Sequence, residues 1–287
     1  MSLLKFALIG LLAHALRELG RIFVSIMVRL QDSDCELGIK YRIITGKDCP
    51  ELLDISDEVV VSSWPEFMLK NPVANEYWAD LYQTFPEFQF AMLEISTNNV
   101  IAVGNSIPLA WDGNYGDLPD NGWEWALARG FKDCAVSRAP NIQCALSLTI
   151  PQNYRGRGIS AQALQAMKTI GKAYGFDAMM APVRPNLKSR YPLTTMEQYT
   201  RWQNDDGLPF DPWIRVHVRL GAGIVKVCTR SMRIIGTVED WERWTGMRFP
   251  ESGMYIVPGA LVPVEIDYGA NQGIYVEPNV WMRHSLR

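Results

Sequence analysis

One segment of the sequence constrains the fold more than any other, because an apolar stretch runs into a loop of glycines and arginines and a helical pattern follows. Leu148-Thr149-Ile150 is compatible with a strand, residues 154–158 read Tyr-Arg-Gly-Arg-Gly, and Leu164, Met167 and Ile170 repeat at helical spacing. Unpaired backbone N–H groups at the start of a helix bind anions, and glycines let the backbone approach closely. The segment therefore predicts a strand, a phosphate-binding loop and a helix in succession.

Several kinds of loop compete for this segment. A P-loop needs G-x-x-x-x-G-K-[ST], which is absent. The dinucleotide pattern G-x-G-x-x-A occurs at residues 156–161, but several elements precede it, and Asp177 lies before the next expected strand instead of ending it. A nicotinamide-binding loop stays open as an alternative, as does a plain strand-to-helix connection that binds nothing.

A third kind of loop matches better. Arg155-x-x-Gly158-x-Ser160 resembles the R/Q-x-x-G-x-G/A loop of the GNAT superfamily of acyl-CoA N-acyltransferases, with a small serine in the last position. In that family the loop grips the pyrophosphate of coenzyme A, and the preceding strand hydrogen-bonds the pantetheine arm. The resemblance therefore implies an acetyl-CoA or other acyl-CoA site at these residues: Leu148, Ile150, Arg155, Gly156, Arg157, Gly158, Ile159 and Ser160.

A second stretch supports the resemblance. Residues 217–222, His-Val-Arg-Leu-Gly-Ala, followed by an apolar run at 224–227, look like the family's Y-x-K-x-G-F end of its fourth helix. The similarity spans roughly residues 39–260 and is strongest over 146–183. It implies a mixed α/β fold with a splayed, mostly antiparallel sheet flanked by helices.

The expected elements agree with a mixed α/β chain. Periodicity and turn signals predict helices over residues 50–69, 75–85, 123–131, 161–174, 196–202 and 213–220. They predict strands over residues 39–44, 88–95, 100–109, 142–150, 178–183, 224–227 and 254–257.

We expect one acyltransferase domain over residues 35–287, with an insertion at about 184–210 and a C-terminal extension after 260. Residues 1–34 form a separate amphipathic helix in this prediction, with Arg17, Glu18 and Arg21 interrupting the apolar run before it is long enough to span a membrane. Residues 3–29 are expected to pack on the body of the protein, in a homodimer or on a membrane surface.

Charge and cysteine content exclude several classes of protein. With 28 Lys and Arg against 31 Asp and Glu, the net charge is −3, which argues against nucleic-acid binding by bulk charge. The five cysteines are scattered and form no C-x-x-C pair, which indicates neither a disulfide framework nor a zinc ribbon and favours the reducing cytoplasm. His14, His217 and His284 are too dispersed to predict a metal site.

The reaction implied by the resemblance is direct attack of an amine on the thioester of an acyl-CoA. The attacking amine must lose a proton, and the leaving thiolate is helped by gaining one. His217 takes the position of the family's catalytic tyrosine, and Glu94 on an expected strand is a candidate for ordering a water. The family's carboxylate on the strand before the loop is missing, since Leu146 and Ser147 occupy those positions.

The acceptor side is less defined. Residues 184–192 are basic and aromatic, suited to the 3′-phosphate of the coenzyme or to an acidic acceptor, and residues 277–279, Glu-Pro-Asn, read as a surface turn. We expect most of the ten tryptophans in the core. If some line the acceptor site, the small-molecule amine is bulky or apolar, or the acyl chain is long. The predicted function is an acyl-CoA-dependent N-acyltransferase. A catalytically inactive CoA-binding module and a membrane-surface protein are the alternatives.

Overall fold

A computed structural model of the chain describes residues 33–34 and 39–287. The predicted amphipathic helix, and with it the expected homodimer or membrane contact through residues 3–29, lies outside the described residues. Of the 1–34 segment only β1 (Ser33–Asp34) is described, as a two-residue strand paired with β2 (Lys40–Thr45).

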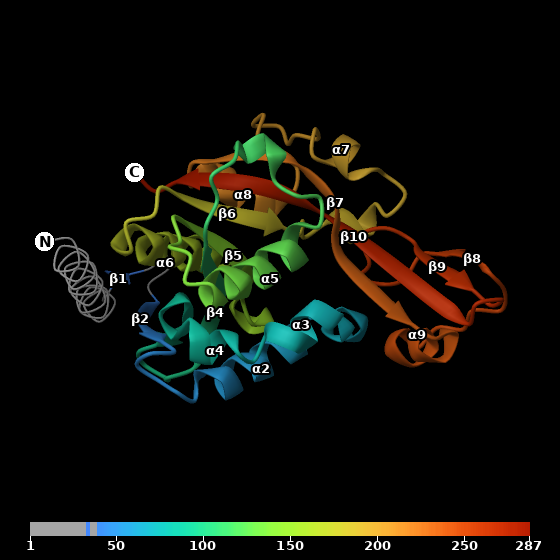
Figure 1. Cartoon of the computed structure of the whole chain (residues 1–287), viewed down its shortest axis with the longest axis horizontal. Coiled ribbons are helices and arrows are strands. Elements are labelled where there is room, and N and C mark those ends of the chain that lie inside the picture. Colours follow the sequence, from blue (N-terminus) through green and yellow to red (C-terminus); the bar gives the residue numbers. More distant parts are fainter. Residues whose placement is uncertain (1–32, 35–38) are drawn as a thin grey trace, which may run out of the picture.

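All ten described strands belong to one sheet (Figure 1). Besides β1 and β2, in sheet order, they are β3 (Gln89–Glu94), β4 (Val100–Leu109), β5 (Ile142–Thr149), β6 (Ala178–Val183), β10 (Gln272–Ser285), β9 (Val264–Asp267) and β8 (Gly253–Tyr255), with β7 (Ala222–Gly236) on the other side of β10. Every pairing is antiparallel except β5 with β6. The predicted mixed α/β fold with an open, mostly antiparallel sheet is confirmed.

Helices cover both faces of this sheet. They are α2 (Leu52–Ser63), α3 (Pro72–Tyr77), α4 (Leu81–Thr84), α5 (Gly122–Ala135), α6 (Ile159–Ala173), α7 (Met196–Tyr199), α8 (Pro212–Arg219) and α9 (Val238–Thr245). Single 3₁₀ turns are η1 (Glu66–Lys70), η2 (Pro86–Phe88), η3 (Tyr115–Asp117), η4 (Gln152–Tyr154) and η5 (Lys188–Arg190).

Close contacts assign α5 and α6 to opposite faces. Gly130 of α5 packs against the side chain of Ile107, and Gly171 of α6 packs against that of Gln143. Gln143 is the register partner of Pro108, so its side chain lies on the face opposite to that of Ile107. At both glycines a Cβ atom would lie 2.3 Å from these side chains. Glycine therefore lets each helix approach the sheet more closely than a residue with a side chain could.

The predicted insertion at 184–210 packs onto the sheet. Met196 and Tyr199 of α7 are buried against Val183 of β6 and Met282 of β10, in a second apolar cluster that also contains Ile214 of α8. The segment therefore covers β6 and β10 on one face and is not a solvated loop.

The chain beyond residue 236 differs most from the sequence prediction. The helix α9 was not predicted, and β10, within the expected extension, lies between β6 and β7 in the sheet. The outer halves of β7 and β10 continue into a small lobe with β9, β8 and α9 (Figure 1). There Trp241 of α9 packs so closely on Gly273 that a Cβ would lie 2.1 Å from the indole, which explains a glycine inside a strand.

Candidate active site

The two parallel strands β5 and β6 separate after three residues. Ile142, Gln143 and Cys144 pair with Ala178, Met179 and Met180, and the rest of β5 has no partner on β6. The two strands therefore diverge toward their carboxyl ends, and we call the space between these ends the cleft.

A β-bulge coincides with the point of separation. Ala145 pairs with Ser106 of β4 and Ser147 with Asn105, so Leu146 has no partner on β4. A bulge bends its strand and increases its twist. The bulge also reverses which side chains of β5 point to which face of the sheet. Ala145 and Ser147 pair with two successive residues of β4, Ser106 and Asn105, and therefore lie on opposite faces.

The helix α5 holds this bulge in place. Its Trp123 donates from the indole Nε1 to the carbonyl oxygen of Leu146 at 2.8 Å, and the backbone N–H of Trp123 donates to Ser231 Oγ of β7 at 2.9 Å. A carbonyl that the bulge removes from the strand ladder is thus satisfied by a buried side chain. Gly122 allows the contact, since a Cβ there would lie 2.5 Å from Ser231 Oγ.

The predicted phosphate-binding loop joins β5 to α6. Gly156 and Gly158 have φ angles of +78° and +70°, a region that favours glycine. Gly158 is the N-cap of α6, and no side chain caps the first turn of that helix. Residues 155–158 are exposed, so the uncapped N–H groups and the arginines lie together at the surface, which suits an anion.

Contacts within the loop orient its two arginines. Arg155 donates from Nε to the carbonyl of Ile150 at 3.0 Å, and the guanidinium of Arg157 lies 5.6 Å from the centre of the Tyr154 ring. All eight residues of the predicted coenzyme site lie on this one continuous strand, loop and helix start.

Glu94 lies beside the loop and not at the bulge. Its carboxylate accepts from the Tyr154 hydroxyl at 3.2 Å, and Asn99 Nδ2 donates to that same hydroxyl at 3.3 Å. Because Leu93 pairs with Val100 and Val103 with Thr149, Glu94 is about 20 Å along the sheet from Leu146. Glu94 therefore contacts the loop through Tyr154 and lies far from the bulge.

His217 is enclosed. It is 1% exposed, its Nδ1 lies 2.9 Å from Nε2 of His284 on β10, and its Nε2 has no partner among the described residues. Burial lowers the pKa of His217 well below its ordinary value, and His284 and Lys168 act in the same direction. The structure therefore does not bring the two predicted catalytic residues together, and neither faces the bulge by any described contact.

The open end of the cleft carries residues that no sequence pattern indicates. Trp64, at the end of α2, lies between the two diverging strands: its Nε1 is 3.5 Å from Thr149 Oγ1 of β5, and Arg184, just after β6, stacks on its ring at 5.5 Å. Ser147 Oγ lies 3.3 Å from Thr149 Oγ1. No local pattern marks Trp64, because its role follows from the packing of α2 on the sheet.

The expected surface turn at residues 277–279 is wrong. These residues form an irregularity inside β10, where Glu277 and Asn279 are buried. Glu277 accepts hydrogen bonds from Arg184, from Tyr275 Oη at 2.8 Å and from Asn279 Nδ2 at 3.0 Å. Burial and the neighbouring carboxylate of Glu277 raise the pKa of Tyr275 well above its ordinary value.

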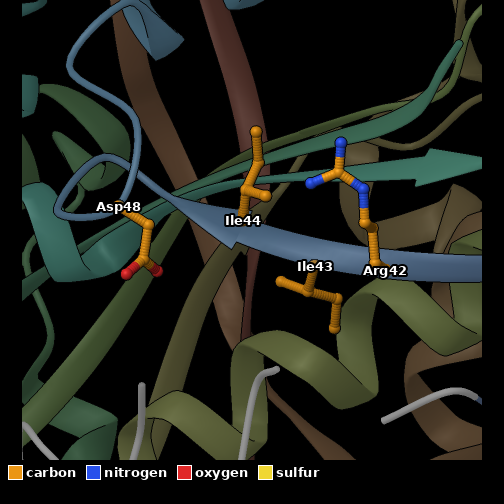
Figure 2. Close-up of a pocket in the computed structure, with 4 residues that line it drawn as sticks. All are labelled: Arg42, Ile43, Ile44 and Asp48. Atoms are coloured by element: carbon orange, nitrogen blue, oxygen red, sulfur yellow. The ribbon is translucent and has the colours of Figure 1, made fainter. Parts of the chain in front are cut away.

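A separate hollow of about 220 Å³ lies on β2 (Figure 2). Arg42, Ile43, Ile44 and Asp48 line it, with Ile43 on the opposite side of the strand from Arg42 and Ile44. Since β3 and β4 separate β2 from β5 in the sheet, this hollow is not the cleft between the diverging strands.

The described residues contain neither a metal-binding cluster nor a membrane-spanning helix. Over residues 33–34 and 39–287, no three His, Cys, Asp or Glu side chains are grouped as a metal site would need. In the same part of the chain, no helix combines the length and apolarity needed to cross a bilayer.

Comparison with known proteins gives one relative along nearly the whole chain. The arginine N-acetyltransferase avaD of Aspergillus versicolor is 31% identical over 288 aligned residues, which cover 90% of this chain and 99% of the relative. No protein-family model matches the sequence.

Solved structures share the fold at low identity. The loading GNATL domain of CurA from Lyngbya majuscula superposes with a TM-score of 0.55 at 17% identity, covering 86% of this chain and 98% of that domain. The GphF GNAT-like decarboxylase, solved with isobutyryl-CoA, gives a TM-score of 0.50 at 15% identity, covering 86% of this chain and all of that one.

Proposed function

The chain belongs to the GNAT superfamily and is an acyl-CoA-dependent N-acyltransferase, and from this premise we propose how its cleft works. The loop at residues 155–160 binds the pyrophosphate of the acyl-CoA, and the pantetheine arm lies between β5 and β6. The observation that carries this proposal is the uncapped start of α6 directly beyond the unpaired half of β5.

The backbone of β5 supplies the contacts for the arm. After Cys144 one edge of this strand has no partner on β6, so its N–H and C=O groups are available to an extended amide-bearing chain. We propose that Leu148 and Ile150 make these contacts. Placing the pyrophosphate at Gly158 then directs the thioester toward the bulge at Leu146.

The chemistry at the bulge is attack of a neutral amine on the thioester carbonyl, with the thiolate as leaving group. We propose that the hydroxyls of Ser147 and Thr149 hand the proton of the amine to water, since Ser147 adjoins the bulge and its hydroxyl oxygen lies 3.3 Å from that of Thr149. Glu94 keeps the loop in shape through Tyr154 instead of taking this proton. His217 supports the packing of α8 on β10.

We propose arginine, or a compound that carries an arginine side chain, as the acceptor. The support is the printed activity of the 31% identical relative, which aligns over 90% of this chain. A small-molecule amine also fits a cleft whose open end is spanned by a single indole, that of Trp64. The predicted cytoplasmic location remains a proposal, supported by cysteines that are free at positions 49, 134, 144 and 228.

A thiol-release assay with acetyl-CoA and a panel of amines tests the proposed function. We expect transfer to arginine, and an Arg157→Gln variant with a KM for acetyl-CoA raised about tenfold, because a charge-assisted hydrogen bond to phosphate is lost. Arg138→Gln is the matched control, since Arg138 pairs with Asp112 at the other end of β5. Binding of CoA without transfer to any amine would instead support the inactive CoA-binding module.

A further inference from the structure

Arg184 follows β6 directly, at the open end of the cleft, and is held in one orientation. Its Nε donates to both carboxylate oxygens of Glu277 at 3.0 and 2.9 Å, and its Nη2 donates to the carbonyl of Gly259 at 2.6 Å. One face of the guanidinium lies on Trp64. These contacts restrain all the rotatable bonds of a side chain that is otherwise flexible.

The anchor of this arrangement is itself fixed. Glu277 is fully buried and accepts from Tyr275 and Asn279 as well as from Arg184. Moving a charged carboxylate from water into the protein interior is costly, and four hydrogen bonds from three side chains compensate for this cost. Glu277 therefore acts as a rigid support for Arg184.

One donor group of the guanidinium takes no part in these bonds. Glu277 and Gly259 are bonded by Nε and Nη2 and not by Nη1, and the Arg184 side chain is 20% exposed while Glu277 is fully buried. The guanidinium lies over the ring of Trp64, which also reaches Thr149 on β5. A guanidinium of fixed orientation thus lies where the two strands diverge, next to the indole that reaches the strand with the bulge.

We propose that Arg184 binds an oxygen acceptor next to the α-carbon of the acceptor substrate, either a carboxylate or an amide carbonyl. This inference rests on the proposed function and narrows it to amino acids and their amide derivatives, as opposed to simple amines. A pre-oriented guanidinium loses little entropy on binding and favours planar oxygen groups. Glu277 neutralises the charge of Arg184, so a carbonyl and a carboxylate are both compatible with the site.

The experiment compares each amino acid with its amide and with the amine left by decarboxylation. The series are arginine, argininamide and agmatine; lysine, lysinamide and cadaverine; tryptophan, tryptophanamide and tryptamine. Initial rates with acetyl-CoA are measured for the wild type and for Arg184→Lys, which keeps a cation beside Glu277 but lacks Nη1. We expect the wild type to prefer the oxygen-bearing acceptors about tenfold or more in kcat/KM, and Arg184→Lys to lose that preference through KM.

Arg129→Lys is the matched control. Arg129 donates from Nε to Asp133 at 2.7 Å and from Nη2 to the carbonyl of Ala110, just after β4, and its guanidinium lies over the Trp125 ring. This variant loses the same kind of contacts and should keep the wild-type preference. Thermal melting of both variants reports whether they remain folded.

Three outcomes separate the hypotheses. Equal kcat/KM for amino acids and their decarboxylated amines in the wild type would overturn the inference and leave the proposed function standing. An Arg184→Lys variant that slows all acceptors equally, with the preference retained, would also overturn it, because that result indicates a structural role. Absence of transfer to every amine would overturn the proposed function, and the inference with it.

Discussion

The indole Nε1 of Trp123 donates to the carbonyl oxygen of Leu146 at 2.8 Å, so a helix residue stabilises the one position of β5 that has no partner on β4. Trp123 is 23 residues upstream and lies on the face opposite to α6. The bulge at the separation of β5 and β6 is therefore held from outside the strand.

Replacing Trp123 by phenylalanine should relax this bulge. The carbonyl of Leu146 would be left buried without a donor, which costs about 1–3 kcal/mol of the free energy of unfolding. We also expect a lower kcat, since the strand edge that aligns the thioester loses its support. Trp78→Phe is the control, because Trp78 stacks on Trp123 at 6.0 Å. Equal melting temperatures and rates in both variants would contradict the role given to Trp123.

Replacing Gly158 by alanine should weaken acyl-CoA binding. The φ angle of +70° costs an L-residue about 1 kcal/mol, and relaxing it turns the first N–H groups of α6 away from the phosphate. Gly207→Ala is a matched control, because Gly207, within the 184–210 segment, has the same φ of +70°, and no atom lies within 4 Å of the place its Cβ would take. We expect similar losses of stability but a raised KM for acetyl-CoA only at position 158. A KM raised equally in both variants would argue against the loop site.

Replacing Glu94 by glutamine tests whether it acts on the loop or on the amine. A glutamine still accepts from the Tyr154 hydroxyl, so we expect kcat to stay within about twofold of the wild type. Tyr154→Phe removes the hydroxyl that joins Glu94 to Asn99 and should raise the KM for acetyl-CoA. A large loss of kcat in Glu94→Gln, with a changed pH profile, would restore Glu94 as a general base.

The buried pair His217 and His284 should make stability depend on pH. Burial, with Lys168 nearby, lowers the pKa of His284 to about 4 from an ordinary value of 6.5. Between these values the unfolded chain binds more protons than the folded one, so the free energy of unfolding falls as the pH drops from about 6.5 to about 4. The pKa shift of His284 makes the free energy of unfolding roughly 3 kcal/mol higher above pH 6.5 than below pH 4.

Chemical denaturation at several pH values measures this dependence. The double variant His217→Leu, His284→Leu removes both partners at once, so neither ring is left without its hydrogen bond, and we expect a flatter curve between pH 6.5 and 4. An unchanged curve would mean that other groups titrate in this range. His217→Phe alone with unaltered turnover would exclude a catalytic role for His217.

Local patterns predicted the centre of the site. The strand at 142–150, the loop, the helix at 161–174 and the strand at 178–183 agree with β5, α6 and β6 within about two residues. This part succeeds because its signals are contiguous: alternation, two glycines that require positive φ, and helical spacing. The predicted strands over 88–95 and 100–109 agree in the same way with β3 and β4, which pair with each other.

Long-range contacts account for what the sequence did not predict. The bulge at Leu146 depends on Trp123, and the orientation of Arg184 depends on a glutamate 93 positions away. Proline in Glu277-Pro278-Asn279 favours a turn, whereas the structure accommodates it as an irregularity within β10. His217 was aligned correctly to a helix end, but burial against β10, a strand that was not predicted, decides its chemistry.

The position of β10 has a consequence for how the protein is made. Its residues are synthesised after β6, β7, α9, β8 and β9, yet it lies between β6 and β7. While the chain is still emerging from the ribosome, β6 exposes an apolar edge with unpaired backbone groups, and such an edge promotes association with other chains. Until β10 is synthesised, Arg184 also lacks its hydrogen-bond partner Glu277. One wall of the cleft therefore becomes complete only when the last described strand inserts, and shortening β10 should affect yield before it affects catalysis.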